Sequence, residues 1–296
     1  TGKWQLATLE IHPEHIREAG YETWCIWQIW RNGAKTIRYW DPCLNEDGAV
    51  LPGLESRFGP DVLAEYVVAC MRQAVKEDRP FLIHHNMLLP HTPIVKTPED
   101  RSLRRQGSLR GMIQYMDQLV GKLVEEVDAL GIGEETCIIF LGDNGTDTVD
   151  TIHHTREGEV RGGKRTLDDA GTHLPFLVRW RGKVPANSVA EDLVDVVDLF
   201  PTFCELAGAL LPEGRTLDGV SLLGRLLRGE PVGRIATIAG FQKSFSVFDG
   251  EWRLHSDGTL MEACDLPRET VVKENEINDE AAAARARLSP LLEIFD

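Results

Sequence analysis

An amphipathic segment that ends in glycines and leads directly into an apolar segment constrains the fold most. Apolar residues recur at helical spacing over residues 107–130, where they form one stripe. Gly131 and Gly133 end this pattern, and the β-branched and aromatic run 136–141 follows, as expected of a buried strand. Alternation of helix and strand is typical of an α/β protein, in which helices cover a mostly parallel sheet.

Further segments extend this organisation. By the same criteria we expect helices at 61–75 and 194–206 and strands at 81–85 and 175–180. Pro201 is tolerable in the second helix only if it lies in the first turn. The tail differs, because the turn pairs Asp249-Gly250 and Asp257-Gly258 separate three short strand candidates, 245–247, 251–255 and 259–262, before a helix at 279–294. We therefore expect an α/β domain over residues 1–235 and an antiparallel β subdomain with a terminal helix over residues 236–296.

The expected strand at 136–141 is followed directly by Gly142-Asp143-Asn144-Gly145. In open α/β sheets, ligands bind just beyond the carboxyl ends of such strands. Asp143 and Asn144 are therefore candidates for a functional site. A tight turn explains the same residues without any ligand, because Asp, Asn and Gly all favour turns.

Three further polar residues lie at or beside the ends of apolar segments. Lys3 follows Gly2, His91 lies in Leu-Pro-His-Thr-Pro, and Lys164 lies in Arg-Gly-Gly-Lys-Arg. Taken singly, each has a plain alternative explanation: an exposed lysine, a loop-capping histidine and a solvated basic turn.

Charge and cysteine usage exclude several classes of protein. The formal net charge of -15 argues against nonspecific binding to nucleic acid or to an anionic membrane surface, so an anionic substrate would need a local basic site. No apolar run is long enough to cross a bilayer. The six cysteines form no Cys-x-x-Cys pair, which argues against a zinc site and a dense disulfide framework.

The order of short motifs along the chain is more specific than any one of them. They are Gly2-Lys-Trp4, Pro80-Phe81 with Pro90-His-x-Pro93, Asp117-x-x-Val-Gly-x-Leu123, Phe140-x-x-Asp-Asn-Gly145, Gly162-Gly-Lys164, Gly171-x-x-x-Pro-Phe-x-Val-Arg-Trp180, Val197-Asp-Leu-Phe-Pro-Thr-Phe203, Leu206-Ala-Gly208, Asp218-Gly-Val-Ser-Leu-Leu223 and Asp249-Gly-Glu-Trp-Arg-Leu254. This series closely resembles the type I sulfatases of the alkaline phosphatase superfamily, over essentially the whole chain.

The resemblance implies an alkaline-phosphatase-like α/β fold, with a mixed β-sheet flanked by helices and a small C-terminal antiparallel sheet with a helix. It implies hydrolysis of organic sulfate monoesters, on a carbohydrate or an aryl group. By family, Asp143 and Asn144 bind a calcium ion, Lys3 and Lys164 contact the sulfate oxygens, and His91 lies near the bridging oxygen. Such a cluster of cations would stabilise charge on a transferring sulfuryl group. We expect these five residues to converge on one pocket.

The sequence departs from the family pattern in three ways. The family nucleophile is a formylglycine made in Cys/Ser-x-Pro-x-Arg, which does not occur here, and two further calcium-binding aspartates belong to an upstream segment without a counterpart. Gln5 stands where the family carries a histidine, so this substrate-binding position can form hydrogen bonds but cannot exchange protons near neutral pH. Another histidine, His173, is expected to be structural.

These departures lead us to expect a fragment that lacks the N-terminal part of the catalytic domain and has little activity alone. Two alternatives remain open: a phosphate or phosphonate ester hydrolase of the same superfamily, and a catalytically silent binding protein. A Cys-x-Pro-x-Arg motif upstream of Thr1 would favour the enzyme. The family further implies export from the cytoplasm and a small-molecule or glycan sulfate as partner. We also expect association with further copies of the chain.

Overall fold

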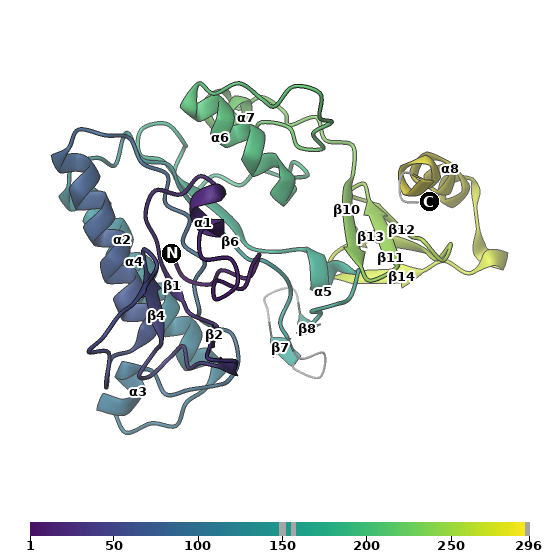
Figure 1. Cartoon of the computed structure of the whole chain (residues 1–296). Coiled ribbons are helices and arrows are strands. Elements are labelled where there is room, and N and C mark those ends of the chain that lie inside the picture. Colours follow the sequence, from purple (N-terminus) through teal and green to yellow (C-terminus); the bar gives the residue numbers. More distant parts are fainter. Residues whose placement is uncertain (148–151, 155–157, 294–296) are drawn as a thin grey trace. The chain divides into compact units, whose positions relative to one another are not determined.

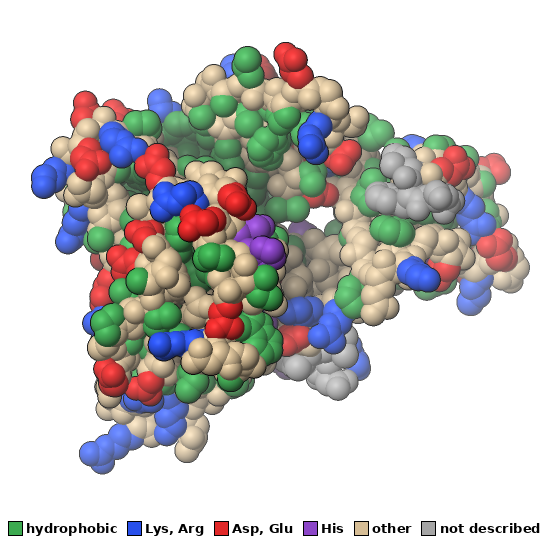
Figure 2. Space-filling model, in the orientation of Figure 1, with side chains coloured by type: hydrophobic (Ala, Val, Ile, Leu, Met, Phe, Trp, Pro, Cys, Tyr) green, Lys and Arg blue, Asp and Glu red, His purple; other side chains and the backbone are tan. Residues whose placement is uncertain are grey.

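The computed structural model describes residues 1–147, 152–154 and 158–293, and the chain forms two compact units, Thr1–Thr136 and Cys137–Asp296. Figure 1 shows the elements of both. We describe each unit separately. None of the helices in the described ranges has the length and apolar character needed to cross a membrane. Acidic and basic side chains intermix over the face of the molecule that Figure 2 shows.

Two long helices dominate the first unit. Helix α2 (Gly59–Lys76) begins with Gly-Pro in its first turn, and helix α4 (Leu109–Ala129) begins after Ser108, whose hydroxyl accepts a 3.0 Å hydrogen bond from the Gly111 amide. The helices expected at 61–75 and 107–130 are thus confirmed. Their apolar faces contact each other and a core that includes Cys25, Trp27, Leu44, Phe58, Leu63, Met112 and Leu119.

The strands of this unit are short. They are β1 (Cys25–Trp27), β4 (Leu44–Glu46) and β5 (Ala49–Val50), paired antiparallel in that order, and the hairpin β2 (Trp30–Arg31) with β3 (Ala34–Lys35). The short helices α1 (His15–Glu18) and α3 (Pro98–Ser102) complete the unit. Residues 81–85, which we expected as a strand, form no strand. The next residue, Asn86, forms an isolated parallel bridge with Gly2.

The second unit contains the strand of the Asp-Asn-Gly motif. Strand β6 (Ile138–Leu141) pairs with β9 (Phe176–Arg179) in antiparallel register, with Ile138 opposite Arg179 and Leu141 opposite Phe176. Both strands were expected from the sequence, but the parallel arrangement suggested by helix–strand alternation is wrong for this pair. The segment between them contains the antiparallel strands β7 (Ile152–His154) and β8 (Glu159–Arg161) and the short helix α5 (Asp169–Thr172).

The helices that follow are held together by one buried carboxylate. The 3₁₀ helix η1 (Val196–Asp198) leads into α6 (Leu199–Ala207), and α7 (Leu223–Arg228) follows. The α-helix expected at 194–206 begins only at Leu199, which places Pro201 in its first turn. Asp198 is fully buried and accepts hydrogen bonds from the Asp195 and Val220 amides, both at 2.8 Å, and from the Arg234 guanidinium. The Asp198 carboxylate therefore joins the Val197–Phe203 motif, to which it belongs, to the Asp218–Leu223 motif, which contains Val220.

The C-terminal part is an antiparallel sheet covered by a helix, as the sequence predicts, but it has five strands and not the three expected (Figure 1). Its strands, which pair in chain order, are β10 (Thr237–Phe241), β11 (Ser244–Phe248), β12 (Trp252–His255), β13 (Leu260–Asp265) and β14 (Arg268–Val271). After the 3₁₀ helix η2 (Glu274–Glu276), helix α8 (Asp279–Leu292) packs Ala281, Ala284 and Leu288 against the sheet. The prediction of separate domains 1–235 and 236–296 stays a prediction.

Candidate functional site

In the second unit, the loop after β6 and the loop that carries Lys164 lie against each other. The Gly145 amide donates to the carbonyl of Gly171 at 3.2 Å, and the Lys164 amide donates to the carbonyl of Thr146 at 2.9 Å. The structure therefore brings the Asp143-Asn144 pair and Lys164 onto adjacent loops, although they are about twenty residues apart in sequence.

Glycines allow this close approach. A Cβ atom on Gly145 would lie 2.1 Å from the carbonyl oxygen of Ala170, and a Cβ atom on Gly163 would lie 2.4 Å from the carbonyl carbon of the same residue. Neither space can hold a side chain. The glycines around the two motifs thus serve the contact between these loops.

The side chains of Asp143 and Asn144 are exposed at the end of β6. The Asn144 amide nitrogen donates to the Asp143 carboxylate at 3.0 Å and to the Gly145 carbonyl at 3.3 Å. The amide oxygen is therefore the Asn144 atom that can face a cation. Carboxylate and amide oxygens suit calcium, which takes six to eight oxygen ligands in general, so this pair fits calcium but supplies only part of a shell. Within the described ranges, no cluster of three or more His, Cys, Asp or Glu residues could hold a metal.

Lys164 is available to an anion. Its side chain is 22% exposed, and its ammonium nitrogen lies 3.8 Å from an Asp147 carboxylate oxygen. A contact of this length is weak and can exchange for a shorter, charge-assisted hydrogen bond to an anion.

Lys3 and Gln5 lie at the start of the first unit. Gly2 forms parallel bridges to both Ile26 and Asn86, and the Lys3 amide donates to the Asn86 carbonyl at 2.9 Å. Gly2 has φ +93°, and a Cβ atom there would lie 1.8 Å from the Asn86 carbonyl oxygen, so glycine is required. The Lys3 side chain is half-buried, and Gln5 is exposed.

His91 is exposed at the tip of a loop that two neighbouring residues hold in place. The Tyr39 hydroxyl shares its one proton between the carbonyl of Leu88, at 2.8 Å, and that of His91. The guanidinium of Arg38 contacts His91 Nδ1 at 2.9 Å. The sequence does not single out Arg38, because it belongs to no motif; its one signal is its place directly before the aromatic pair Tyr39-Trp40.

The expected convergence on one pocket stays a prediction. Lys3, Gln5 and His91 belong to the first unit, whereas Asp143, Asn144 and Lys164 belong to the second.

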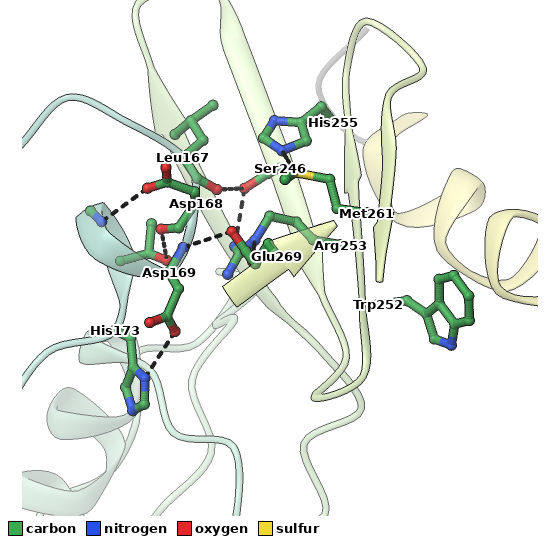
Figure 3. A network of polar contacts seen from close by, with 12 residues as sticks. Leu167, Asp168, Asp169, His173, Ser246, Trp252, Arg253, His255, Met261 and Glu269 are labelled. Carbon is green, nitrogen blue, oxygen red and sulfur yellow. Dashed lines mark hydrogen bonds and ion pairs between the residues drawn. The ribbon is translucent and has the colours of Figure 1, made fainter. Parts of the chain in front are cut away.

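A polar network holds the loop that follows Lys164 against the C-terminal sheet (Figure 3). The Glu269 carboxylate accepts hydrogen bonds from the Arg253 guanidinium at 2.6 Å and from the Asp169 amide at 3.0 Å. The Ser246 hydroxyl donates to the carbonyl of Leu167 at 3.0 Å. The C-terminal strands therefore position the segment between Lys164 and β9.

His173 belongs to the same network, through a 2.9 Å contact from its Nδ1 to the Asp169 carboxylate. The hydrogen bond to Asp169 raises the pKa of His173 above its ordinary value. A histidine whose pKa is raised by folding stabilises the folded state at pH values below its pKa in the unfolded chain. This contribution is lost as the pH rises through its pKa in the folded chain. The side chain is 67% exposed, so the effect is small. His173 thus has a structural contact, as expected.

Comparison with solved structures identifies the class of fold. One similar structure is the crystal structure of Ps i-CgsB in complex with k-i-k-neocarrahexaose. The alignment covers 99% of this chain and 70% of that chain, with a TM-score of 0.78 and 20% sequence identity. Another is the structure of BT4656 in complex with its substrate D-glucosamine-2-N,6-O-disulfate. That alignment covers 93% of this chain and 75% of that chain, with a TM-score of 0.70 and 15% sequence identity. The fold is the alkaline-phosphatase-like α/β fold of the sulfatases, which confirms the predicted fold class.

Sequence comparison identifies the family. The Sulfatase family model matches residues 13–209, which is well over half of the chain, so the chain belongs to the sulfatase family. It is 32% identical to arylsulfatase G of Mus musculus over 209 residues, which is 64% of this chain and 38% of that protein. It is 34% identical to human arylsulfatase A over 180 residues, which is 60% of this chain and 34% of that protein. The chain thus matches only about a third of the length of these relatives.

Proposed function

We propose that the chain supplies the binding residues of a sulfate ester hydrolase. In this proposal Lys3, His91 and Lys164 contact the sulfate group, while Asp143 and Asn144 are ligands of a calcium ion. The observation that carries it is the backbone contact that holds Lys164 beside the turn of Asp143 and Asn144, in a member of the sulfatase family. A bound calcium ion would offset charge on the sulfate oxygens.

A carbohydrate or aryl sulfate is the proposed substrate class. The relatives include arylsulfatases and a canine N-acetylgalactosamine-6-sulfatase, and one structural neighbour was solved with a sulfated sugar. The chain contains no Cys/Ser-x-Pro-x-Arg, so we expect the 296 residues alone to bind sulfate and to hydrolyse aryl sulfates no faster than background. An exported location is proposed on the family alone.

Replacing Lys164 tests the proposed sulfate contact. We expect Lys164→Ala to weaken binding of inorganic sulfate by about tenfold or more, because a charge-assisted hydrogen bond is lost. Isothermal titration with sodium sulfate at low ionic strength measures the change.

Lys243→Ala is the matched control, since it removes the same charge from the exposed turn between β10 and β11. Equal weakening by both variants would mean that sulfate responds only to net charge, and the proposed contact would be wrong. Sulfate that binds Lys164→Ala as tightly as the unaltered chain would refute the contact as well.

A further inference from the structure

Arg38 is a buried cation beside the proposed substrate-binding histidine. Its side chain is 8% exposed, and its guanidinium carbon lies 4.7 Å from the centre of the Trp27 ring and 5.4 Å from that of Tyr39. Burial lowers the pKa of Arg38 from its ordinary value. An arginine nevertheless stays protonated in proteins, so every guanidinium N–H is a donor and none can accept.

One guanidinium nitrogen of Arg38 faces two atoms of the His91 loop. Its Nη2 lies 2.9 Å from His91 Nδ1 and also donates to the carbonyl oxygen of Thr92. His91 Nδ1 and this carbonyl oxygen are 2.8 Å apart. The nitrogen carries two N–H groups, so it can serve both acceptors.

The Arg38 contact at Nδ1 favours one tautomer of His91, whereas the Thr92 hydroxyl, 3.4 Å from Nδ1, can donate or accept and so fits either. With a proton on Nδ1, that N–H would donate to the Thr92 carbonyl but would face an Arg38 N–H at 2.9 Å. With the proton on Nε2, Nδ1 presents a lone pair to Arg38, and the guanidinium bridges two acceptors. A neutral imidazole has one donor and one acceptor nitrogen, and the partner of one nitrogen decides where the proton lies.

We propose that Arg38 is a positioning residue that holds His91 in the tautomer with the proton on Nε2. His91 then presents an N–H donor on the ring nitrogen remote from Arg38. If His91 contacts the sulfate ester, which rests on the function proposed above, this N–H is the group that can donate a hydrogen bond to an ester oxygen. Tyr39 has a different task, since its hydroxyl holds the backbone of the same loop.

Nitrogen-15 NMR of the imidazole rings tests this proposal on the 296-residue chain without any ligand. The two nitrogens of a neutral ring differ strongly in chemical shift according to which one is protonated, and a His91→Gln sample identifies the His91 signals. We expect the unaltered chain to hold the Nε2–H form. In Arg38→Met the ratio of the two tautomers should shift toward Nδ1–H by about tenfold or more, because a charge-assisted hydrogen bond to Nδ1 is lost.

Tyr39→Phe is the matched control, because it removes the hydroxyl contacts to the loop but leaves Arg38 in place. We expect its tautomer ratio to match that of the unaltered chain. An Nδ1–H form in the unaltered chain would overturn the proposal whether or not Arg38→Met folds. An unchanged ratio in Arg38→Met, or an equal shift in Tyr39→Phe, would overturn it too. The proposed function can fail separately. If the unaltered chain holds the Nε2–H form but His91 does not contact added sulfate, the proposed function is refuted and the role of Arg38 stands.

Discussion

Arg253→Met is expected to lower the free energy of unfolding by about 3–5 kcal/mol, because it leaves the charge of Glu269 buried without its ion partner. The Arg253 and Glu269 side chains are only 3% and 4% exposed, and they meet at 2.6 Å. Methionine fills a similar volume, so the lost packing is small compared with the uncompensated charge. Urea unfolding followed by circular dichroism measures the change.

Arg268→Met is a matched control on strand β14. Its ion pair with Asp265 is 3.7 Å long, and the two side chains are 77% and 85% exposed, so we expect a loss within about 0.5 kcal/mol. If Arg253→Met cost no more than Arg268→Met, the buried pair would not hold the C-terminal sheet to the loop after Lys164. The double variant Arg253→Met with Glu269→Leu should recover part of the loss, since both buried charges are then removed.

Asp198→Ala is expected to cause a loss of similar size, about 3–5 kcal/mol. Its carboxylate accepts from two backbone amides and from Arg234, whose side chain is 12% exposed. Alanine leaves the guanidinium and both amides without their acceptor, and each orphaned buried donor adds to the cost. Thermal unfolding monitored by circular dichroism measures the effect.

Two further variants separate the buried network from surface charge. Asp198→Asn keeps one acceptor oxygen, so we expect an intermediate loss. Glu230→Ala removes an exposed partner of Arg228, where both side chains are more than half exposed, and should change stability by less than about 0.5 kcal/mol. A loss for Asp198→Ala that is no larger than that for Glu230→Ala would contradict the role given to Asp198.

Local periodicity and turn chemistry were sufficient to predict most of the elements. Helix α4 was predictable because its stripe is long and Gly131 follows it, and the hairpins after Asp249 and Asp257 were predictable because Asp-Gly pairs favour tight turns. The residues at 81–85 are apolar enough for a strand, but a strand also needs a partner along its length, and periodicity does not supply that information. The antiparallel register of β6 with β9 was hidden for the same reason.

The candidate site was only partly predictable. Asp143, Asn144 and Lys164 could be selected because they follow apolar runs and lie among glycines, and the structure shows that these glycines allow their loops to touch. Arg38 and Glu269 could not be selected. Each contacts a residue far away in sequence, His91 and Asp169 respectively, and no local pattern marks such a partner.

The most direct test of the proposed site is crystallography of the 296-residue chain, with calcium chloride and sodium sulfate soaked into separate crystals because the two salts together precipitate as calcium sulfate. The proposal predicts calcium bound to the carboxylate of Asp143 and the amide oxygen of Asn144, and sulfate in contact with the ammonium group of Lys164. The same experiment on Asp143→Asn should lose the metal, because calcium affinity depends on the charge of its ligands. Calcium and sulfate bound elsewhere, with Asp143 and Asn144 making only turn contacts, would contradict the proposal.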